Sequence, residues 1–272
     1  MAGTTMRMGV AGSAGRMGRM LIREIGATEG AILSAATERS GHPDLGKDAG
    51  ELAGAGPSGV KIDPDSAVLF TASDAVLDFT NPETTMAHVA LAAQARVIHV
   101  IGTTGLNAQH EAELKRAAKH TAIVYAPNMS VGVNLLMALV ERVARILGPD
   151  YDIEIVEMHH RHKVDAPSGT ALGLGRAAAA GRGVALDSVA ARGRDGHTGP
   201  RRRGDIGFAV LRGGDVVGDH SVVFAGPAER IELTHRAAGR ELYARGAVRA
   251  ALWARDKGPG FYSMVDVLGL GS

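Results

Sequence analysis

The residues best suited to chemistry stand close together, in the run E-M-H-H-R-H-K-V-D-A-P-S-G-T-A-L between Glu157 and Leu172. An imidazole titrates near neutral pH and can pass a proton to a reacting centre. Lys163 can supply fixed positive charge or a second proton. Backbone amides around Gly169, together with the Thr170 hydroxyl, are suited to a carboxylate. The run therefore indicates acid–base chemistry on an anionic small molecule.

Two other interpretations of the three histidines compete with proton transfer. On an extended backbone His160 and His162 point one way and His159 the other, so they converge on one metal ion only through a turn. Structural zinc usually takes four ligands, often thiolates, and the chain contains no cysteine. Histidines at a strand end can also simply face solvent, but that interpretation leaves Lys163 and the Ser-Gly-Thr unexplained. We therefore favour proton transfer and expect no metal.

A strand and a helix must position this run. Tyr151 to Val156 alternates polar and apolar residues, which is typical of a strand. Ala171 to Ala180 is rich in Ala and Leu and predicts a helix. Asp165 and Pro167 would set the turn, and Ser168 would open the helix. The reactive residues are thus expected on a strand-to-helix connection, where scaffolds often carry function.

A glycine-rich turn near the N-terminus is a second functional element. A strand, Arg7 to Ala11, precedes a G-x-x-G-x-x-G pattern ending at Gly18, and a helix is expected from Arg16 to Ile25. Glycine suits a positive φ, close approach to a pyrophosphate and a tight helix–sheet contact, and amides at the helix start bind phosphates. A plain tight turn is the alternative. The dinucleotide interpretation assigns these residues to the site: Gly12, Ser13, Ala14, Gly15, Arg16 and Met17.

The next strand favours the dinucleotide interpretation. Ala31 to Thr37 ends at Glu38, about 20 residues after the turn, the spacing at which a carboxylate meets the adenosine ribose. Arg39 follows directly and can receive the 2′-phosphate of NADP. A solvent-facing ion pair is the alternative. Both residues together predict tolerance of NADH and NADPH.

Strands and helices then alternate, which predicts a parallel sheet. The expected strands are Ala75 to Phe79, Val97 to Ile101 and Thr121 to Tyr125, after an exposed loop from Ser40 to Asp65. Ligands bind beyond the carboxyl ends of such strands. The residues expected there, lining one cofactor cleft, are Phe79, Gly102, Thr103, Thr104, Ala126, Pro127, Asn128 and Met129.

The pattern changes in the second half of the chain. Three expected strands, Gly207 to Arg212, Val217 to Ala225 and Arg230 to Thr234, follow one another without helices between them. Such a succession favours an antiparallel or mixed sheet, hence a second domain. A long helix from Arg240 to Lys257 then packs back on the first domain. The fold class is α/β, a Rossmann-like domain plus an α+β domain with a mixed sheet.

Composition narrows the class of protein. The 272 residues carry a formal net charge of +1, and no charge block points to nucleic acid or a membrane surface. Zero cysteines exclude disulfides, thiolate metal sites and a thiol nucleophile, and fit a reducing cytosol. There is no signal peptide and no stretch long enough to span a bilayer. We expect a cytoplasmic protein that acts on a small molecule.

The chain resembles the 4-hydroxy-tetrahydrodipicolinate reductase (dihydrodipicolinate reductase) family over nearly its whole length. The most discriminating match is E-M-H-H-R-H-K-V-D-A-P-S-G-T-A at 157–171. The others are V-A-G-S-A-G-R-M-G at 10–18, Glu38-Arg39, D-F-T at 78–80, G-T-T-G at 102–105 and A-P-N-M-S-V-G-V-N at 126–134.

The resemblance implies a homotetramer with a dinucleotide-binding domain at 1–130 and 240–272 and a substrate-binding and oligomerisation domain at 131–239. It implies reduction of a cyclic dicarboxylate imine by NADH or NADPH, with loss of water, in lysine biosynthesis through diaminopimelate. His159 would be the proton donor or acceptor and Lys163 the proton donor for the ring. His160, Lys163, Gly169 and Thr170 would hold the carboxylates, and Ser168 would also bind the substrate.

One departure from the family pattern and two rival functions stay open. Many members have Phe where this chain has Met129, which leaves ring stacking on the nicotinamide in question. One rival is a related dehydrogenase acting on another acidic metabolite, which the P-S-G-T element does not favour. The other is an NAD(P) sensor without turnover, which has no need of both His159 and Lys163.

Overall fold

The computed structural model describes residues 5–271, which form two compact units. Unit 1 comprises Met1–Val131 and Arg240–Ser272, and unit 2 comprises Gly132–Gly239. The residues described in unit 1 contain a seven-stranded parallel sheet of order β12-β6-β5-β4-β1-β2-β3. Its strands are β1 (Met6–Ala11), β2 (Ala31–Thr37), β3 (Ile62–Asp63), β4 (Ala75–Asp78), β5 (Ile98–Ile101), β6 (Ala122–Tyr125) and β12 (Gly260–Tyr262).

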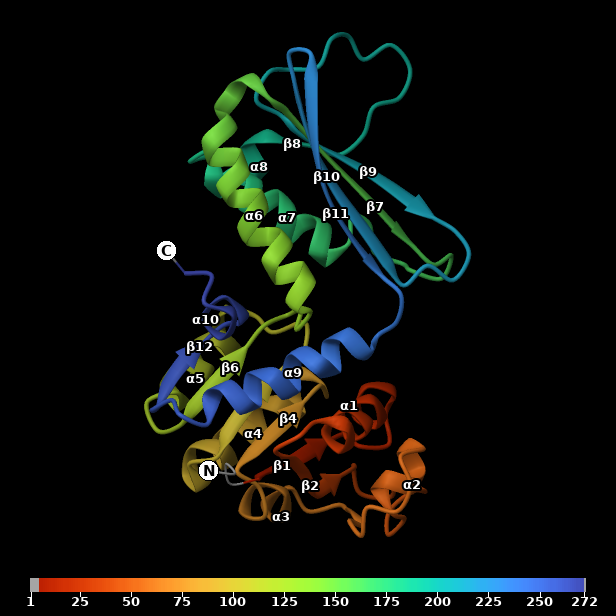
Figure 1. Cartoon of the computed structure of the whole chain (residues 1–272), viewed down its shortest axis with the longest axis vertical. Coiled ribbons are helices and arrows are strands. Elements are labelled where there is room, and N and C mark those ends of the chain that lie inside the picture. The colour runs from red at the N-terminus through yellow and green to blue at the C-terminus, as the bar shows by residue number, and fades with distance from the viewer. Residues whose placement is uncertain (1–4, 272) are drawn as a thin grey trace. The chain divides into compact units, whose positions relative to one another are not determined.

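Helices cover both faces of this sheet (Figure 1). Successive strand residues point to opposite faces, so in β4 Ala75 and Leu77 join one core and Val76 another. The first core lies under α1 (Arg16–Ala27), α9 (Glu241–Ala254) and α10 (Met264–Leu268), with α2 (Ala49–Ala53) at its edge. The other face carries α3 (Ser66–Thr71), α4 (Pro82–Ala95) and α5 (Ala108–Ala117).

The segment from Ser40 to Asp65 is more ordered than its sequence predicts. It contains α2 and β3, and Ile62 is buried. The carboxylate of Asp48, itself buried, accepts hydrogen bonds from the amides of Gly50, Ser58 and Gly59 at 2.8–3.0 Å. One buried acceptor therefore organises the loop, an effect that hydrophobic periodicity cannot reveal.

Unit 2 has a mixed five-stranded sheet of order β11-β10-β7-β9-β8. β7 pairs parallel with β9 and antiparallel with β10. Figure 1 shows its helices on one face of the sheet, where their apolar residues meet those of the strands. The elements are α6 (Val131–Leu147), a 3₁₀ turn (Gly148–Asp150), β7 (Asp152–His159), α7 (Gly169–Gly181), α8 (Leu186–Val189), β8 (Ala190–Ala191), β9 (Ile206–Arg212), β10 (Gly218–Gly226) and β11 (Glu229–Ala237).

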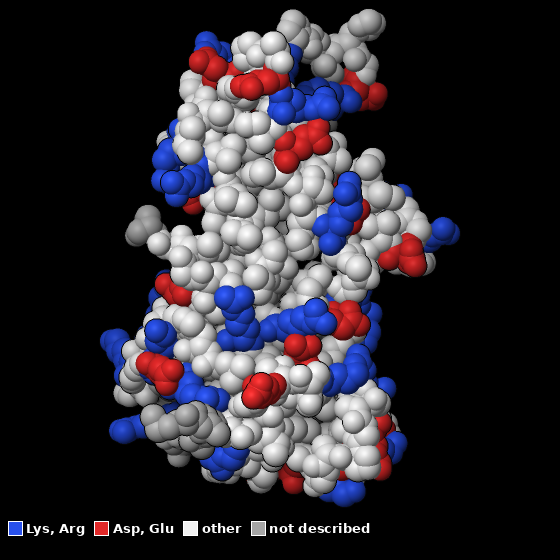
Figure 2. Space-filling view, in the orientation of Figure 1, with Lys and Arg blue, Asp and Glu red and all other residues white. Residues whose placement is uncertain are grey.

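The predicted fold class is confirmed: a parallel sheet with helices in one unit and a mixed sheet in the other. The surface carries charges of both signs, and Figure 2 shows Lys and Arg interspersed with Asp and Glu on the visible face. Across residues 5–271, no helix has the length and apolar character needed to cross a bilayer.

Candidate functional site

The glycine turn after β1 has the geometry of a phosphate cradle. Gly12 has a φ of +64°, and a Cβ at Gly18 would overlap the carbonyl oxygen of Gly12. Helix α1 begins after Gly15, with no side-chain hydrogen bond capping its first turn. The amides at that helix start remain suited to an anion, which the helix dipole also favours.

The structure brings Glu38 to this turn. The Glu38 carboxylate accepts hydrogen bonds from the amides of Ala14 at 3.3 Å and Arg39 at 3.0 Å. The Ser13 amide in turn donates to the Thr37 carbonyl at 2.9 Å. Arg39 is exposed, so its guanidinium is accessible to a ligand. The acid and the glycine turn therefore lie together, and their shared role in binding a dinucleotide stays a prediction.

The remaining predicted cofactor residues follow β4, β5 and β6 at the same edge of the sheet. The Phe79 ring packs on Gly102, where a Cβ would collide with it. Met129 is 1% exposed and belongs to the core with α9, so the predicted contact of its side chain with a nicotinamide ring is not supported. Also buried are Ser13, Ala14, Thr103 and Ala126; accessible at least in part are Gly12, Gly15, Arg16, Met17, Gly102, Thr104, Pro127 and Asn128.

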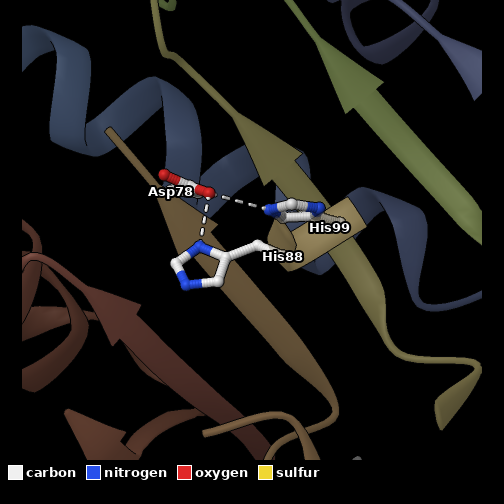
Figure 3. A group of neighbouring side chains, drawn as sticks. All are labelled: Asp78, His88 and His99. Atoms are coloured by element: carbon white, nitrogen blue, oxygen red, sulfur yellow. Dashed lines mark hydrogen bonds and ion pairs between the residues drawn. The ribbon is translucent and has the colours of Figure 1, made fainter. Parts of the chain in front are cut away.

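Beneath this edge lies a buried group that the sequence does not reveal. The Asp78 carboxylate interacts through Oδ2 with His88 Nδ1 at 2.8 Å and with His99 Nε2 at 3.2 Å. Figure 3 shows both rings directed at that one carboxylate. Through Oδ1, Asp78 also accepts from the Thr80 amide at 3.0 Å and hydroxyl at 2.6 Å. The group thus braces the segment that leaves β4.

Hydrogen bonding explains this group without a metal ion. Ligand atoms of Asp78, His88 and His99 lie within 4.8 Å of one another, but all three side chains are nearly inaccessible. His88 Nε2 is bonded to Ser66 Oγ at 3.0 Å. Burial would raise the pKa of Asp78, but the two histidine bonds outweigh it and hold that pKa below its usual range. An ionised Asp78 between two imidazole donors is therefore already satisfied.

In unit 2, His159 is the last residue of strand β7, which extends beyond its predicted end at Val156. Its Nδ1 lies 2.6 Å from Glu157 Oε2, and only 9% of the residue is exposed. Glu157 also receives Arg212 through both oxygens, at 2.8 and 3.0 Å. Sequence reasoning missed Arg212 as a site residue and gave Glu157 no role. Glu157 stands two residues before His159, and on a strand this spacing predicts that both side chains lie on the same face.

The connection from β7 to α7 carries the other predicted residues. The ring centroids of His160 and His162 lie 6.3 Å apart. Lys163 Nζ is bonded to Asp165 Oδ1 at 2.8 Å, and this bond is the main cause that lowers the pKa of Asp165. Helix α7 begins at Gly169, followed by Thr170, so its first turn offers amides to an anion.

Ser168 lies at the start of helix α7. Its amide donates to Glu157 Oε1 at 3.0 Å, and its hydroxyl caps α7 at the Ala171 amide at 3.1 Å. The hydroxyl also bonds to His220 Nε2 at 3.0 Å. Ser168 is 2% exposed and supports the helix start, and its contact with a substrate carboxylate stays a prediction.

A cavity of about 1030 Å³ at the opposite edge of the unit 1 sheet is not a better candidate. It is lined by several cations, including Arg96, Lys119 and Lys257. These follow the C-termini of α4, α5 and α9, where positive charge complements the helix dipole. Its charge is therefore explained without a ligand.

The parallel sheet, the glycine turn and Glu38 are those of a nicotinamide-dependent oxidoreductase. The family model described as the N-terminus of dihydrodipicolinate reductase matches residues 6–129, and the model of its C-terminus matches residues 132–268. The chain belongs to the dihydrodipicolinate reductase family.

Curated relatives and a solved structure agree with the family models. The 4-hydroxy-tetrahydrodipicolinate reductase of Rhodopseudomonas palustris is 61% identical over 265 residues, 97% of this chain and 98% of the relative. That of Beijerinckia indica is 59% identical over 266 residues, 98% of each chain. A dipicolinate-bound dihydrodipicolinate reductase from Paenisporosarcina sp. TG-14 shares the fold, with a TM-score of 0.77 at 22% identity, covering 97% of this chain and 99% of that one.

Proposed function

We propose that the chain reduces 4-hydroxy-tetrahydrodipicolinate with NADH or NADPH, in lysine biosynthesis through diaminopimelate. The hydroxyl leaves with a neighbouring ring proton as water, one hydride and one proton enter the ring, and tetrahydrodipicolinate and the oxidised cofactor are formed. The observation that carries the proposal is the end of β7 and its connection to α7, which place an imidazole, an ammonium and the start of a helix within one short segment. Support comes from relatives at 59–61% identity that bear this reductase name.

Each residue of the connection has a distinct part in the proposal. His159 exchanges a proton with the substrate, and Lys163 donates a proton to the ring. The substrate is a dicarboxylate, so it needs cations and amides: His160, Lys163 and the first residues of α7, Gly169 and Thr170. The Paenisporosarcina protein is described as dipicolinate bound, an analogous planar dicarboxylate.

In unit 1, the amides that start α1 would hold the cofactor's pyrophosphate and Glu38 the adenosine ribose. When bound, the nicotinamide supplies the hydride. Arg39 is exposed beside Glu38, which supports use of NADPH as well as NADH. Comparing KM for the two cofactors in one preparation decides the preference.

A coupled assay tests the activity. The substrate is generated from aspartate semialdehyde and pyruvate by a synthase, and loss of NAD(P)H absorbance is followed. We expect oxidation only when both precursors are present. No oxidation at high enzyme concentration would rule out the proposed reaction.

Lys163→Ala is expected to lower kcat about 10²–10³-fold, because a proton donor and a carboxylate contact disappear together. Dinucleotide affinity, measured by fluorescence titration, should stay within about twofold of wild type. The exposed Arg161, two residues earlier, is the matched control, and Arg161→Ala should change kcat little. Equal loss of turnover and cofactor affinity in Lys163→Ala would contradict the assignment.

We further propose that unit 1 is the dinucleotide-binding domain and unit 2 the substrate-binding domain of a cytoplasmic homotetramer. On the strands of unit 2, Leu211 is 49% and Ile231 37% exposed, which favours subunit contacts there. The absence of cysteine fits the cytoplasm. Light scattering after size exclusion should give four times the chain mass, and a monomeric mass would contradict the assembly.

A further inference from the structure

We infer that Glu157 is a positioning residue for His159: its carboxylate holds the imidazole as the Nδ1–H tautomer, so that Nε2 exchanges the proton. Arg212 holds the carboxylate in turn. The inference rests on the proposed function of His159 and specifies how the chain prepares that side chain for it.

The strand itself creates the pair. Glu157 and His159 are two residues apart on β7, so both side chains project from the same face. Glu157 is 1% exposed, and its Oε2 is 2.6 Å from His159 Nδ1. An ionised carboxylate only accepts hydrogen bonds, so Nδ1 carries the proton and Nε2 is left as the second nitrogen.

The surroundings keep Glu157 ionised. Burial alone would raise its pKa, but the bonds from Arg212, His159 and the Ser168 amide together lower it. Arg212 binds both carboxylate oxygens, a fork geometry that restricts their rotation. Parallel pairing places Arg212 directly opposite His159 in register. The buried Glu157 carboxylate, fixed by Arg212, thus binds only the Nδ1 atom of His159.

The same contacts reach the rest of the predicted site. Arg212 Nη2 also donates to the Asp165 carbonyl at 2.7 Å, and Asp165 binds Lys163. Thus Glu157 and Arg212 link the strand end to the turn that carries the lysine. The ion pair therefore contacts one proposed proton donor, His159, directly and reaches the other, Lys163, only through Asp165.

A residue on the neighbouring strand β10 packs against the ring of His159. His220 on β10 packs edge-on against it, with ring centroids 5.1 Å apart. Burial, with the nearby His159, lowers the pKa of His220 to about 4, so His220 is neutral at pH 7. Of the charged or titratable groups within unit 2, Glu157 and His220 contact His159, Arg212 binds Glu157, and Lys163 and His235 act on His220.

Glu157→Gln tests the inference. A glutamine keeps the shape but loses the charge, and its NH₂ group can face Nδ1 and favour the opposite tautomer. We expect kcat to fall about 100-fold, the KM for NADH to stay within about twofold, and the pH–rate profile to shift toward acid. Unchanged kcat and an unchanged profile in a folded variant would overturn the inference.

Glu154→Gln is the matched control. Glu154 lies on β7 as well and is paired with arginines, in its case Arg194 and Arg201. It is on the other face of the strand and does not contact His159. It should lose comparable ion pairing while kcat stays within about twofold. An equal loss of kcat in both variants would mean that disturbing strand β7, and not losing the Glu157 carboxylate, lowers kcat.

A measurement on the wild-type protein does not depend on the variants folding. ¹⁵N NMR of histidine-labelled enzyme, with His159→Gln used for assignment, should show His159 as the Nδ1–H tautomer at neutral or higher pH. An Nε2–H tautomer would overturn the inference. Because no substrate is involved, this result stands whether or not the coupled assay detects reductase activity.

Discussion

Each unit buries a carboxylate beside histidines, and the two arrangements differ in access and in counter-charge. In unit 1, Asp78 lies between His88 and His99, and none of the three side chains is more than 4% exposed. In unit 2, Glu157 lies between His159 and Arg212, and the His159 side chain is 11% exposed at the end of its strand.

This difference distinguishes a group that stabilises the fold, around Asp78, from a group suited to proton transfer, around Glu157. Asp78 is satisfied by imidazole and hydroxyl donors, and burial lowers the pKa of His99, which keeps that ring neutral. Glu157 is paired with a permanent cation, Arg212, and its histidine is the last residue of strand β7. A buried carboxylate and a histidine therefore stabilise a fold when they are enclosed. They can transfer protons when one ring nitrogen stays accessible.

Asp78→Ala should cause the largest loss of stability. It leaves the Nδ1–H of His88, the Nε2–H of His99 and the Thr80 amide without their acceptor inside the core. We expect the free energy of unfolding in urea to fall by roughly 3–5 kcal/mol.

Asp74 supplies the control, since it precedes the same strand but pairs with the exposed Arg7. Asp74→Ala should cost about 1 kcal/mol or less. Similar losses in the two variants would mean that the Asp78 group is not the stabilising one.

Acid should destabilise the protein through the buried imidazoles. His99 and His220 have lowered pKa values, that of His220 about 4, so below pH 6.5 the unfolded chain binds protons that the folded chain does not. Stability therefore falls as pH drops from 7 to 5, by about 2 kcal/mol for His220 alone. Urea unfolding at both pH values should show a smaller drop in His220→Gln, and an equal drop would contradict a neutral His220.

Ser66→Ala should give the smallest effect. It removes the hydroxyl bonded to His88 Nε2 but leaves the Asp78 interaction intact. We expect a loss of about 1 kcal/mol in urea unfolding and no change in kcat. A loss as large as that of Asp78→Ala would mean that the bond between Ser66 and His88, and not the bond between His88 and Asp78, stabilises the fold.

The sequence alone determined most of the fold and half of the site. Alternating strands and helices, the glycine turn and the spacing to Glu38 are local signals, and the structure brings Glu38 onto that turn. The run containing His159 and Lys163 is predicted on a strand-to-helix connection; the structure has Lys163 there but places His159 within strand β7. Local patterns suffice because element type and strand-end position depend on residues near one another in the chain.

Only the tertiary structure decided what supports those residues. Arg212 and His220 reach the Glu157–His159 pair because β9 and β10 flank β7 in a particular register, which no local pattern specifies. The same holds for His88 and His99 around Asp78, and for the burial of Ser168 and Met129. Side chains distant in the sequence meet only when sheets pair and cores close, so burial and counter-charge, which set their chemistry, are properties of the folded chain.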